Sequence, residues 1–467
     1  MKIIVAIANY GTKNLKYLEL LLAEYRRMPF QIDIVVLSNE PKDLGSKVKV
    51  LVGLPAKNPW SLPFAHKSLF AQHVKDYDLF IYSEDDTLIT EKNIRAFLES
   101  TGHLPGNQIP GFLRYETSPD GSRHISSAHG GFHWRPESVK QAGPHTFARF
   151  TNDHSACYIL TREQLERAIA SGGFLVPPYE SDYDMLCSAA TDPYTRCGFT
   201  KVINISRMED FLLPHLPNKY IGVMGTEYSV FITQVEALRQ IAAGIRPATS
   251  ALPNRQLPGT PPWLKNFYES CSQELIDLVP KGARSILSLG IGTGATESEL
   301  ARRDYEVTAI PLDSVICVPA EAAGVKMVHD ELMQGLETLR YRRFDCVMVC
   351  SLLYLQQEPE TLVLKAASLL ADGGCLLIRE PNFGNVQTYA GRLLRNKRHQ
   401  GLGGFSGDCL TPVTEGRLRC WLDSAGLVLS RVIRTAEAAV SSTEKALQLL
   451  PLRLSATEII ILARRRS

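Results

Sequence analysis

Phe80-Ile81-Tyr82-Ser83-Glu84-Asp85-Asp86 is an apolar run that ends in three consecutive carboxylates. The apolar part predicts a buried strand. Three adjacent acids repel one another, and desolvating them costs on the order of several kcal/mol unless a cation arrives. Hard divalent cations take one or two carboxylate ligands and fill their remaining sites with phosphate and water. The stretch therefore predicts a site for a metal and a diphosphate at a strand end, and the plainer alternative is a solvated acidic turn.

The residues before this stretch alternate between strand and helix patterns. They predict strands at 2–8 and 32–37 and helices at 15–25 and 61–74. Such alternation indicates an α/β fold with a mainly parallel sheet. Ligands of these sheets bind beyond the carboxyl ends of the strands. Asn9 and Tyr10, which follow the first strand, are therefore expected to face the same crevice as the acidic triplet.

Residues 1–222 resemble a GT-A nucleotide-sugar glycosyltransferase with a Rossmann-like mixed sheet. The resemblance lies in the order of strand, helix, strand and acid-terminated strand, and the triplet takes the place of the family's metal motif. It implies that Asp86, with Glu84 or Asp85, holds Mn²⁺ or Mg²⁺ against a nucleotide diphosphate. Asn9, Tyr10 and Asp85 would lie near the nucleotide sugar. The metal would act as a Lewis acid on the leaving diphosphate.

The same resemblance implies a base for the acceptor hydroxyl and a late ligand that completes the metal shell. Asp182 is the expected base, with Glu180 second, because both precede a predicted helix at 185–190. Acids in this position are also ordinary partners of a helix dipole. His215, in a proline-flanked loop, is the expected late metal ligand.

Three residues are expected on the acceptor side of the first domain. Trp134 follows a glycine-containing segment and would stack on a sugar ring, while Arg135 suits an anionic group. Asp153 precedes a strand at 158–160 that fits the acceptor-side wall of the family. A plain loop is the alternative interpretation of this segment.

Residues 246–262 are rich in Pro, Ser and Thr and have neither helical nor strand periodicity. They predict a linker between a domain at 1–245 and a second domain at 263–467. A chain of 467 residues predicts about two to three domains, which agrees with this division.

The second domain opens with a strand that runs into Gly290, Gly292 and Gly294 and then into a helix. Further strand patterns follow at 305–310, 328–330, 344–349, 372–378, 426–432 and 458–463. From about 263 to 464 this succession resembles a class I S-adenosylmethionine-dependent methyltransferase, with a doubly wound sheet. The resemblance implies that the three glycines wrap the methionine end of the cofactor and that Asp330 reaches the adenine.

Two positions depart from the pattern of that family. Ser288 stands where the family commonly has an acid that pairs with the cofactor's amino group. Pro311 stands where the acid that binds the ribose commonly lies, and proline offers neither a carboxylate nor a donor. Asp313 is the candidate to compensate. The domain is then either an active methyltransferase or a degenerate structural domain.

The segment after the fifth strand of this domain, at 382–408, carries several basic residues. It is expected over the cofactor site, where it could hold an anionic acceptor or a lipid headgroup, although a solvated basic face is the alternative. Glu380 and Tyr354, near strand ends, are the candidates for a general base.

Composition narrows the class of protein. Lys and Arg number 51 and Asp and Glu 49, and the net charge of +2 argues against a dedicated nucleic-acid binder. Ten cysteines without a CxxC pair favour free thiols in a reducing cytosol. The first residues form a strand rather than a signal peptide, and no apolar run reaches the ~20 residues of a membrane span. We expect a cytoplasmic protein, with contact at the inner face of the membrane as an option.

The two halves together predict a bifunctional enzyme that transfers a sugar to a glycan acceptor, lipid-linked or free, and methylates that sugar or a neighbouring one. One alternative makes the first half a nucleotidyltransferase, which needs a glycine-rich basic loop after the first strand; Asn9–Lys13 is only faintly like one. The other makes the second half a non-catalytic docking module.

Overall fold

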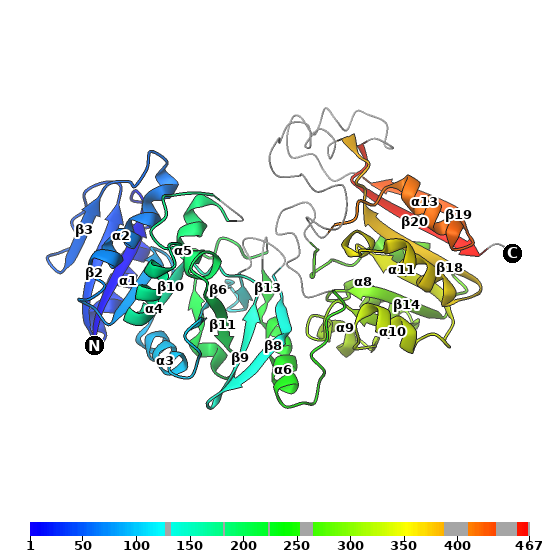
Figure 1. The fold of residues 1–467 in the computed structure, drawn as a ribbon, viewed down its shortest axis with the longest axis horizontal. Coiled ribbons are helices and arrows are strands. Elements are labelled where there is room, and N and C mark those ends of the chain that lie inside the picture. The colour runs from blue at the N-terminus through cyan, green and yellow to red at the C-terminus, as the bar shows by residue number, and fades with distance from the viewer. Residues whose placement is uncertain are drawn as a thin grey trace. The chain divides into compact units, whose positions relative to one another are not determined.

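The computed structural model describes residues 1–126, 132–180, 183–222, 225–252, 265–386, 410–435 and 455–465. The chain divides into two compact units, unit 1 at 1–245 and unit 2 at 246–467 (Figure 1). Each unit is built around its own sheet. No helix in these ranges is long and apolar enough to cross a membrane.

The main sheet of unit 1 has five strands in the order β10-β4-β1-β2-β3. They are β1 (Lys2–Asn9), β2 (Gln31–Ser38), β3 (Val48–Val52), β4 (Leu79–Glu84) and β10 (Cys157–Thr161). The first four are parallel and β10 is antiparallel to β4. Because Ala8 pairs with Glu84, the strand ends at Asn9 and at the acidic triplet lie side by side. The predicted parallel sheet is confirmed, with one antiparallel edge strand.

Helices cover this sheet through apolar stripes. In α1 (Leu15–Arg27) the buried residues include Leu18, Leu22 and Tyr25, at the spacing of one helical face. The helix predicted at 61–74 is divided into η1 (Pro59–Phe64) and α2 (Ala65–Gln72). Pro63 explains the division, since it has no N–H to donate and a tight 3-10 turn suits it better than a continuous α-helix. The other helices are α3 (Glu91–Thr101), α4 (Arg162–Ala170), α5 (Met185–Thr195) and α6 (Tyr228–Ala242).

Unit 1 also contains two four-stranded sheets, in the orders β5-β11-β9-β8 and β12-β6-β7-β13. Their strands are β5 (Gln108–Pro110), β6 (Leu113–Thr117), β7 (Arg123–Ile125), β8 (Trp134–Ala142), β9 (His145–Phe150), β11 (Thr200–Asn204), β12 (Leu212–Pro214) and β13 (Thr226–Glu227). Strand β12 pairs with β6 and ends at Pro214. The next residue, His215, forms a bridge with Thr87, so the chain returns to the acidic triplet directly after β12.

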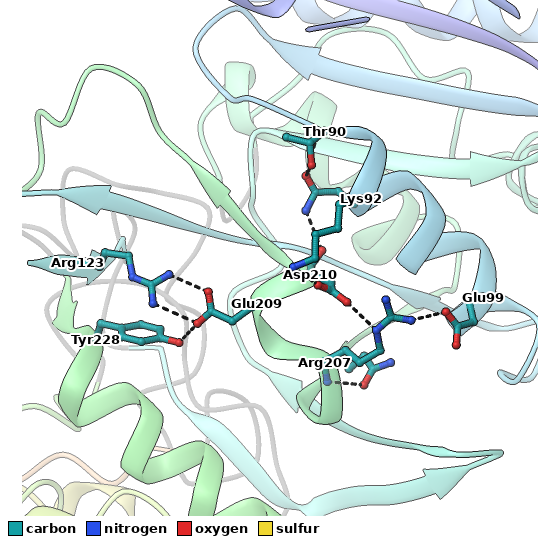
Figure 2. A network of polar contacts seen from close by, with 10 residues as sticks. Thr90, Lys92, Glu99, Arg123, Arg207, Glu209, Asp210 and Tyr228 are labelled. Carbon is teal, nitrogen blue, oxygen red and sulfur yellow. Dashed lines mark hydrogen bonds and ion pairs between the residues drawn. The ribbon is translucent and has the colours of Figure 1, made fainter. Parts of the chain in front are cut away.

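A charged network holds the turn η2 (Ile205–Asp210) against its neighbours, and Figure 2 shows its members. Glu209 accepts two hydrogen bonds from Arg123 of β7, at 2.9 and 3.1 Å, and one from Tyr228 of α6. Arg207 donates to Asp210 within the same turn at 2.6 Å. These side chains are partly exposed, so each pair contributes only about 0–1 kcal/mol, but the two-pronged geometry fixes where η2 meets β7 and α6.

Unit 2 has a seven-stranded sheet in the order β16-β15-β14-β17-β18-β20-β19. The strands are β14 (Ser285–Ile291), β15 (Glu306–Pro311), β16 (Lys326–Met327), β17 (Phe344–Cys350), β18 (Leu370–Pro381), β19 (Leu427–Thr435) and β20 (Glu458–Arg465). The first five are parallel, and β20 is antiparallel to both of its neighbours. The predicted methyltransferase-like sheet is thus observed. One detail differs, since the strand expected to end at Asp330 ends at Met327.

Alternate residues of the central strands enter two separate cores, one on each face of the sheet. Leu287 and Val347 lie in the core covered by α10 (Leu332–Thr338), α11 (Pro359–Ser368) and α13 (Glu415–Ser424). Ile286 and Cys346 lie in the core covered by α7 (Gln273–Leu278), α8 (Ala295–Arg302) and α9 (Val318–Ala322). Burial on both faces explains why these strands are continuous apolar runs in the sequence.

Part of the segment expected to be a linker packs against unit 2. The Ala251 amide donates to the Leu312 carbonyl oxygen at 2.8 Å, and both Ala251 and Leu252 are buried in the first core. Residues 253–262 lie outside the described residues, as do the basic side chains at 392–399.

Candidate functional site

The acidic triplet of unit 1 faces the end of β1, as the sequence predicted. Asn9 donates to Asp85 Oδ2 at 2.5 Å, and Asn14 donates to Asp85 Oδ1 at 2.8 Å. Burial raises the pKa of Asp85 to about 6, against the opposing effect of the Asn14 hydrogen bond. Both oxygens of Asp85 are thus held by amides of unit 1. Tyr10 is exposed beside this group.

Asp86 lies next to His215, the residue proposed as a late metal ligand. The distance from His215 Nε2 to Asp86 Oδ2 is 3.4 Å, and both side chains are buried. Burial disfavours the charged form of Asp86, but the His215 hydrogen bond and nearby positive charges hold its pKa below the usual value. On the other side of the ring, His215 Nδ1 lies 2.5 Å from Glu116 Oε1. A carboxylate behind a histidine fixes the ring and its tautomer, which is the usual support of a metal-binding histidine.

Glu84 lies beside a different histidine, His154. Its carboxylate lies 3.7 Å from His154 Nε2, and burial, followed by repulsion from Asp86, raises its pKa to about 8. Among the described residues, no group of three or more His, Cys, Asp or Glu side chains is arranged to hold a metal ion. The structure therefore does not bring the expected four-residue shell together, since Asp85 is held by Asn9 and Asn14 and Glu84 lies beside His154. Asp86 with His215 is the part of the shell that is assembled.

The structure describes one of the two acids expected to act as the base. Asp182 lies outside the described residues, and Glu180 is exposed. Asp184, a third acid of the same segment, caps α5 by accepting a hydrogen bond from the Cys187 amide at 2.8 Å. At least one acid here therefore has an ordinary helix-capping role.

The expectation that Trp134 presents its ring to a sugar is wrong. The side chain is 1% exposed, and its ring centroid lies 4.9 Å from that of Phe150 and 5.4 Å from that of Phe231. Trp134 is a core residue between β9 and α6. Arg135 is half-buried, and burial lowers its pKa. Asp153 lies 3.9 Å from Arg149, and burial raises the pKa of its carboxyl.

We expect Trp134→Ala to destabilise unit 1 by about 3–5 kcal/mol, the usual effect of emptying a buried aromatic site. Urea unfolding of the full chain, monitored in the transition of unit 1, measures this change. Trp60→Ala is the matched control, since Trp60 is 51% exposed and its loss should change stability little. Equal unfolding midpoints for the two variants would contradict the core role of Trp134.

The glycine turn of unit 2 is tightly packed. Gly290 and Gly294 have φ values of +72° and +68°, which favour glycine. A Cβ atom on Gly292 would lie 2.1 Å from the backbone oxygen of Phe267, and that same oxygen accepts a hydrogen bond from the Thr293 amide at 2.9 Å. The space beside Gly292, expected to admit the cofactor, is taken here by the chain itself.

A carboxyl group that the sequence reasoning missed lies beside Ser288. The hydroxyl of Ser288 donates to Glu297 Oε1, of α8, at 2.7 Å, and both residues are buried. Burial raises the pKa of Glu297 and the Ser288 hydrogen bond opposes that rise. Strand β14 has no acid at this position, and Glu297, in the first turn of the following helix, supplies a carboxyl group there instead. An acid in that turn was visible in the sequence, but no local pattern shows that it reaches back to the strand.

The ribose end of the site is less complete. Asp313 Oδ1 accepts hydrogen bonds from the Val315 and Ile316 amides, at 2.8 and 2.7 Å, and so closes its own turn. Asp330 is half-buried and accepts a bond from Thr338 at 3.4 Å. The carboxyl of Glu297 therefore suits the ammonium of S-adenosylmethionine, whereas Asp313 does not restore the carboxylate that Pro311 lacks.

The two candidate bases of unit 2 are tied to structural roles. Glu380 Oε1 accepts from the Leu352 and Leu353 amides, both at 2.8 Å, and so anchors η3 (Leu353–Leu355) at the end of β17. Burial raises the pKa of Glu380 to about 7. Burial also raises the pKa of Tyr354, which makes it a poor base near neutral pH.

Comparison with known proteins finds a family match within unit 2 and similarity to methyltransferases. Residues 270–398 match the family of the methionine biosynthesis protein MetW. An uncharacterized methyltransferase of Mycobacterium bovis is 28% identical over 122 residues, which cover 25% of this chain and 59% of that protein. An uncharacterized methyltransferase of Mycobacterium tuberculosis matches to the same extent. This chain thus spans little more than half the length of these relatives.

Solved structures give a weaker likeness. A S-adenosylmethionine-dependent methyltransferase from Mesorhizobium loti has a TM-score of 0.31 at 16% identity, covering 41% of this chain and 96% of that one. One from Archaeoglobus fulgidus has a TM-score of 0.31 at 15% identity, covering 41% and 90%. These values are too low to indicate an activity. The sheet of unit 2 and the sequence similarity together support a class I S-adenosylmethionine-dependent methyltransferase-like domain in this half of the chain.

Proposed function

We propose that the protein is a two-unit transferase of the cytoplasm. Unit 2 transfers a methyl group from S-adenosylmethionine, and unit 1 transfers a sugar from a nucleotide-sugar donor to a glycan acceptor. The similarity to uncharacterized mycobacterial methyltransferases, together with the match of residues 270–398 to the family of the methionine biosynthesis protein MetW, carries the first half. The second half rests on the Asp86–His215 pair at the carboxyl ends of parallel strands.

In unit 2 the turn from Gly290 to Gly294 and the carboxyl of Glu297 would hold the methionine end of the cofactor, and Asp330 would reach its adenine. Bound S-adenosylmethionine supplies the methyl group on a sulfonium. Glu297, buried beside Ser288, offers a negative charge to an ammonium group. The missing ribose carboxylate weakens binding, since a lost hydrogen bond to a polar partner costs about 1–3 kcal/mol.

We expect S-adenosylhomocysteine, the demethylated cofactor, to bind the full chain in the micromolar to tens of micromolar range, or roughly −6 to −8 kcal/mol. Calorimetry measures the affinity, and a thermal shift of unit 2 supports it, because a ligand at about 100 times its Kd stabilises by about 2.7 kcal/mol. Absence of both heat and shift at millimolar ligand would reduce unit 2 to a structural domain.

In unit 1 we assign Asp86 and His215 to a Mn²⁺ or Mg²⁺ ion that faces the donor diphosphate, with Glu116 positioning the ring of His215. Asp182, or Glu180 in its place, would take the proton of the acceptor hydroxyl. Asn9 supports the site by holding Asp85. Incubation of the full chain with a panel of nucleotide sugars and Mn²⁺ tests the assignment through release of the nucleoside diphosphate. No release with any donor, with or without glycan, would remove sugar transfer from the proposal.

A further inference from the structure

A lysine is buried at the end of the proposed cofactor site. Lys265 is 1% exposed, and its Nζ donates to the backbone oxygen of Cys350, at the end of β17, at 3.1 Å. The same ammonium lies 3.1 Å from Glu269 Oε1. Lysine is rarely buried, because removing its charge from water is costly unless the surroundings replace that hydration. The place that Lys265 occupies is therefore one that stabilises a cation.

Two further carboxyl groups lie near enough to this ammonium for its charge to affect them. The charge of Lys265 acts to lower the pKa values of both Glu297 and Glu380, although burial raises both more strongly. Glu297 lies beside Ser288 of β14, and Glu380 lies in β18. The direct partners of the ammonium are the Cys350 oxygen, at the end of β17, and the Glu269 carboxylate.

The residues next to Lys265 cover the glycine turn itself. The Phe267 oxygen accepts the hydrogen bond of the Thr293 amide and fills the space beside Gly292. The Phe267 side chain is buried in the core that also contains Leu289 and Leu352. Residues 265–269 thus provide both an ammonium and a backbone cover where the glycine turn would meet the methionine end of a cofactor.

We propose that Lys265 is an internal substitute for the ammonium group of S-adenosylmethionine, and that residues 265–269 must withdraw before the cofactor enters. This inference rests on the methyltransferase function proposed for unit 2. A carboxylate together with a backbone carbonyl is a suitable partner set for either ammonium group, and the charge assistance strengthens such bonds. Two ammonium groups cannot share the place, because like charges repel strongly where water is excluded.

Cofactor binding then depends on how often the segment is withdrawn. The apparent Kd equals the intrinsic Kd divided by the fraction of molecules in the open state. Removing the charge of Lys265 leaves the Glu269 carboxylate and the Cys350 oxygen without a cation between them. The closed state of residues 265–269 is then less stable. An incoming ammonium group is also bound more strongly, because no other cation occupies its place.

Calorimetry on the full chain with two ligands tests the proposal. S-adenosylhomocysteine carries the amino-acid ammonium, whereas 5′-methylthioadenosine lacks the amino-acid end. Lys265→Met removes the charge and keeps the length of the side chain, and Lys281→Met, at an exposed lysine, is the control. We expect Lys265→Met to bind S-adenosylhomocysteine about tenfold more tightly than wild type, with a change of less than about threefold for 5′-methylthioadenosine. The control should match wild type for both ligands.

The outcomes separate this inference from the function on which it rests. Equal or weaker binding of S-adenosylhomocysteine by Lys265→Met overturns the substitute role and leaves the methyltransferase proposal standing. No binding by either protein at millimolar ligand removes both. A measurement on wild type decides the matter if the variant does not fold. Amine acetylation followed by mass spectrometry should find Lys265 protected in the free protein and labelled faster with saturating S-adenosylhomocysteine, and unchanged protection would overturn the proposal.

Discussion

Asp86→Ala is expected to abolish the proposed sugar transfer of unit 1 while leaving the unit folded. Loss of a metal ligand removes transition-state stabilisation of several kcal/mol, so transfer should fall by a factor of about a thousand or more. The fold should tolerate the change, because the charge of Asp86 repels Glu84 and raises its pKa. His215 keeps its contact with Glu116 in the variant.

The measurement is release of nucleoside diphosphate from a donor that wild type accepts, in the presence of Mn²⁺. Asp76→Ala is the matched control, since Asp76 is an exposed aspartate of the same unit that pairs with His73 at 2.8 Å. The thermal unfolding of both variants should resemble that of wild type. Near wild-type turnover in Asp86→Ala would show that Asp86 is not a metal ligand.

Gly292→Val is expected to destabilise unit 2 by about 2–4 kcal/mol and to remove binding of S-adenosylhomocysteine. A Cβ atom at this position would lie 2.1 Å from a backbone oxygen, so residues around Phe267 must move and the Thr293 hydrogen bond is lost. Overpacking of this kind costs about 1–3 kcal/mol, and a lost hydrogen bond adds about 1 kcal/mol. The valine would also project into the space that the methionine end of the cofactor needs.

Chemical unfolding of the full chain and calorimetry of the folded variant measure the two effects. Gly282→Val is the control, because a Cβ at Gly282 meets nothing within 4 Å. If Gly292→Val were as stable as this control, residues 265–269 would not rest on the glycine turn in solution.

The strands and glycine turn were predictable because their signals are local. Residues 3–8 and 346–350 are continuous apolar runs because their strands are buried on both faces. The prediction that His215 lies beside Asp86 rested on a family resemblance, since no local sequence pattern shows that residues so distant in the chain meet. The Trp134 prediction failed because a neighbouring glycine suggests exposure, whereas the partners that bury the ring come from β9 and α6.

Sequence reasoning missed three residues that shape the candidate sites, two of them because their partners are distant in the chain. Glu116 supports His215 across 99 positions of the chain, and Lys265 meets Cys350 across 85. Only the folded sheet brings such pairs together, and neither residue differs in type from the many surface acids and lysines of the chain. Glu297 is close to Ser288 in sequence, yet its inward direction depends on the tight turn at Gly294.

The two edges of the unit 2 sheet bear on the solubility of the protein. An exposed, flat edge strand is a template on which another chain can add a strand and begin to aggregate. The edge strand β16 is only Lys326–Met327, and Lys326 forms an ion pair with Glu306. On the opposite edge, β19 carries arginines, and its register with β20 shifts between Leu429 and Arg431. Short length, charge and an irregular register thus discourage intermolecular strand addition at either edge, which protects a sheet whose interior is almost entirely apolar.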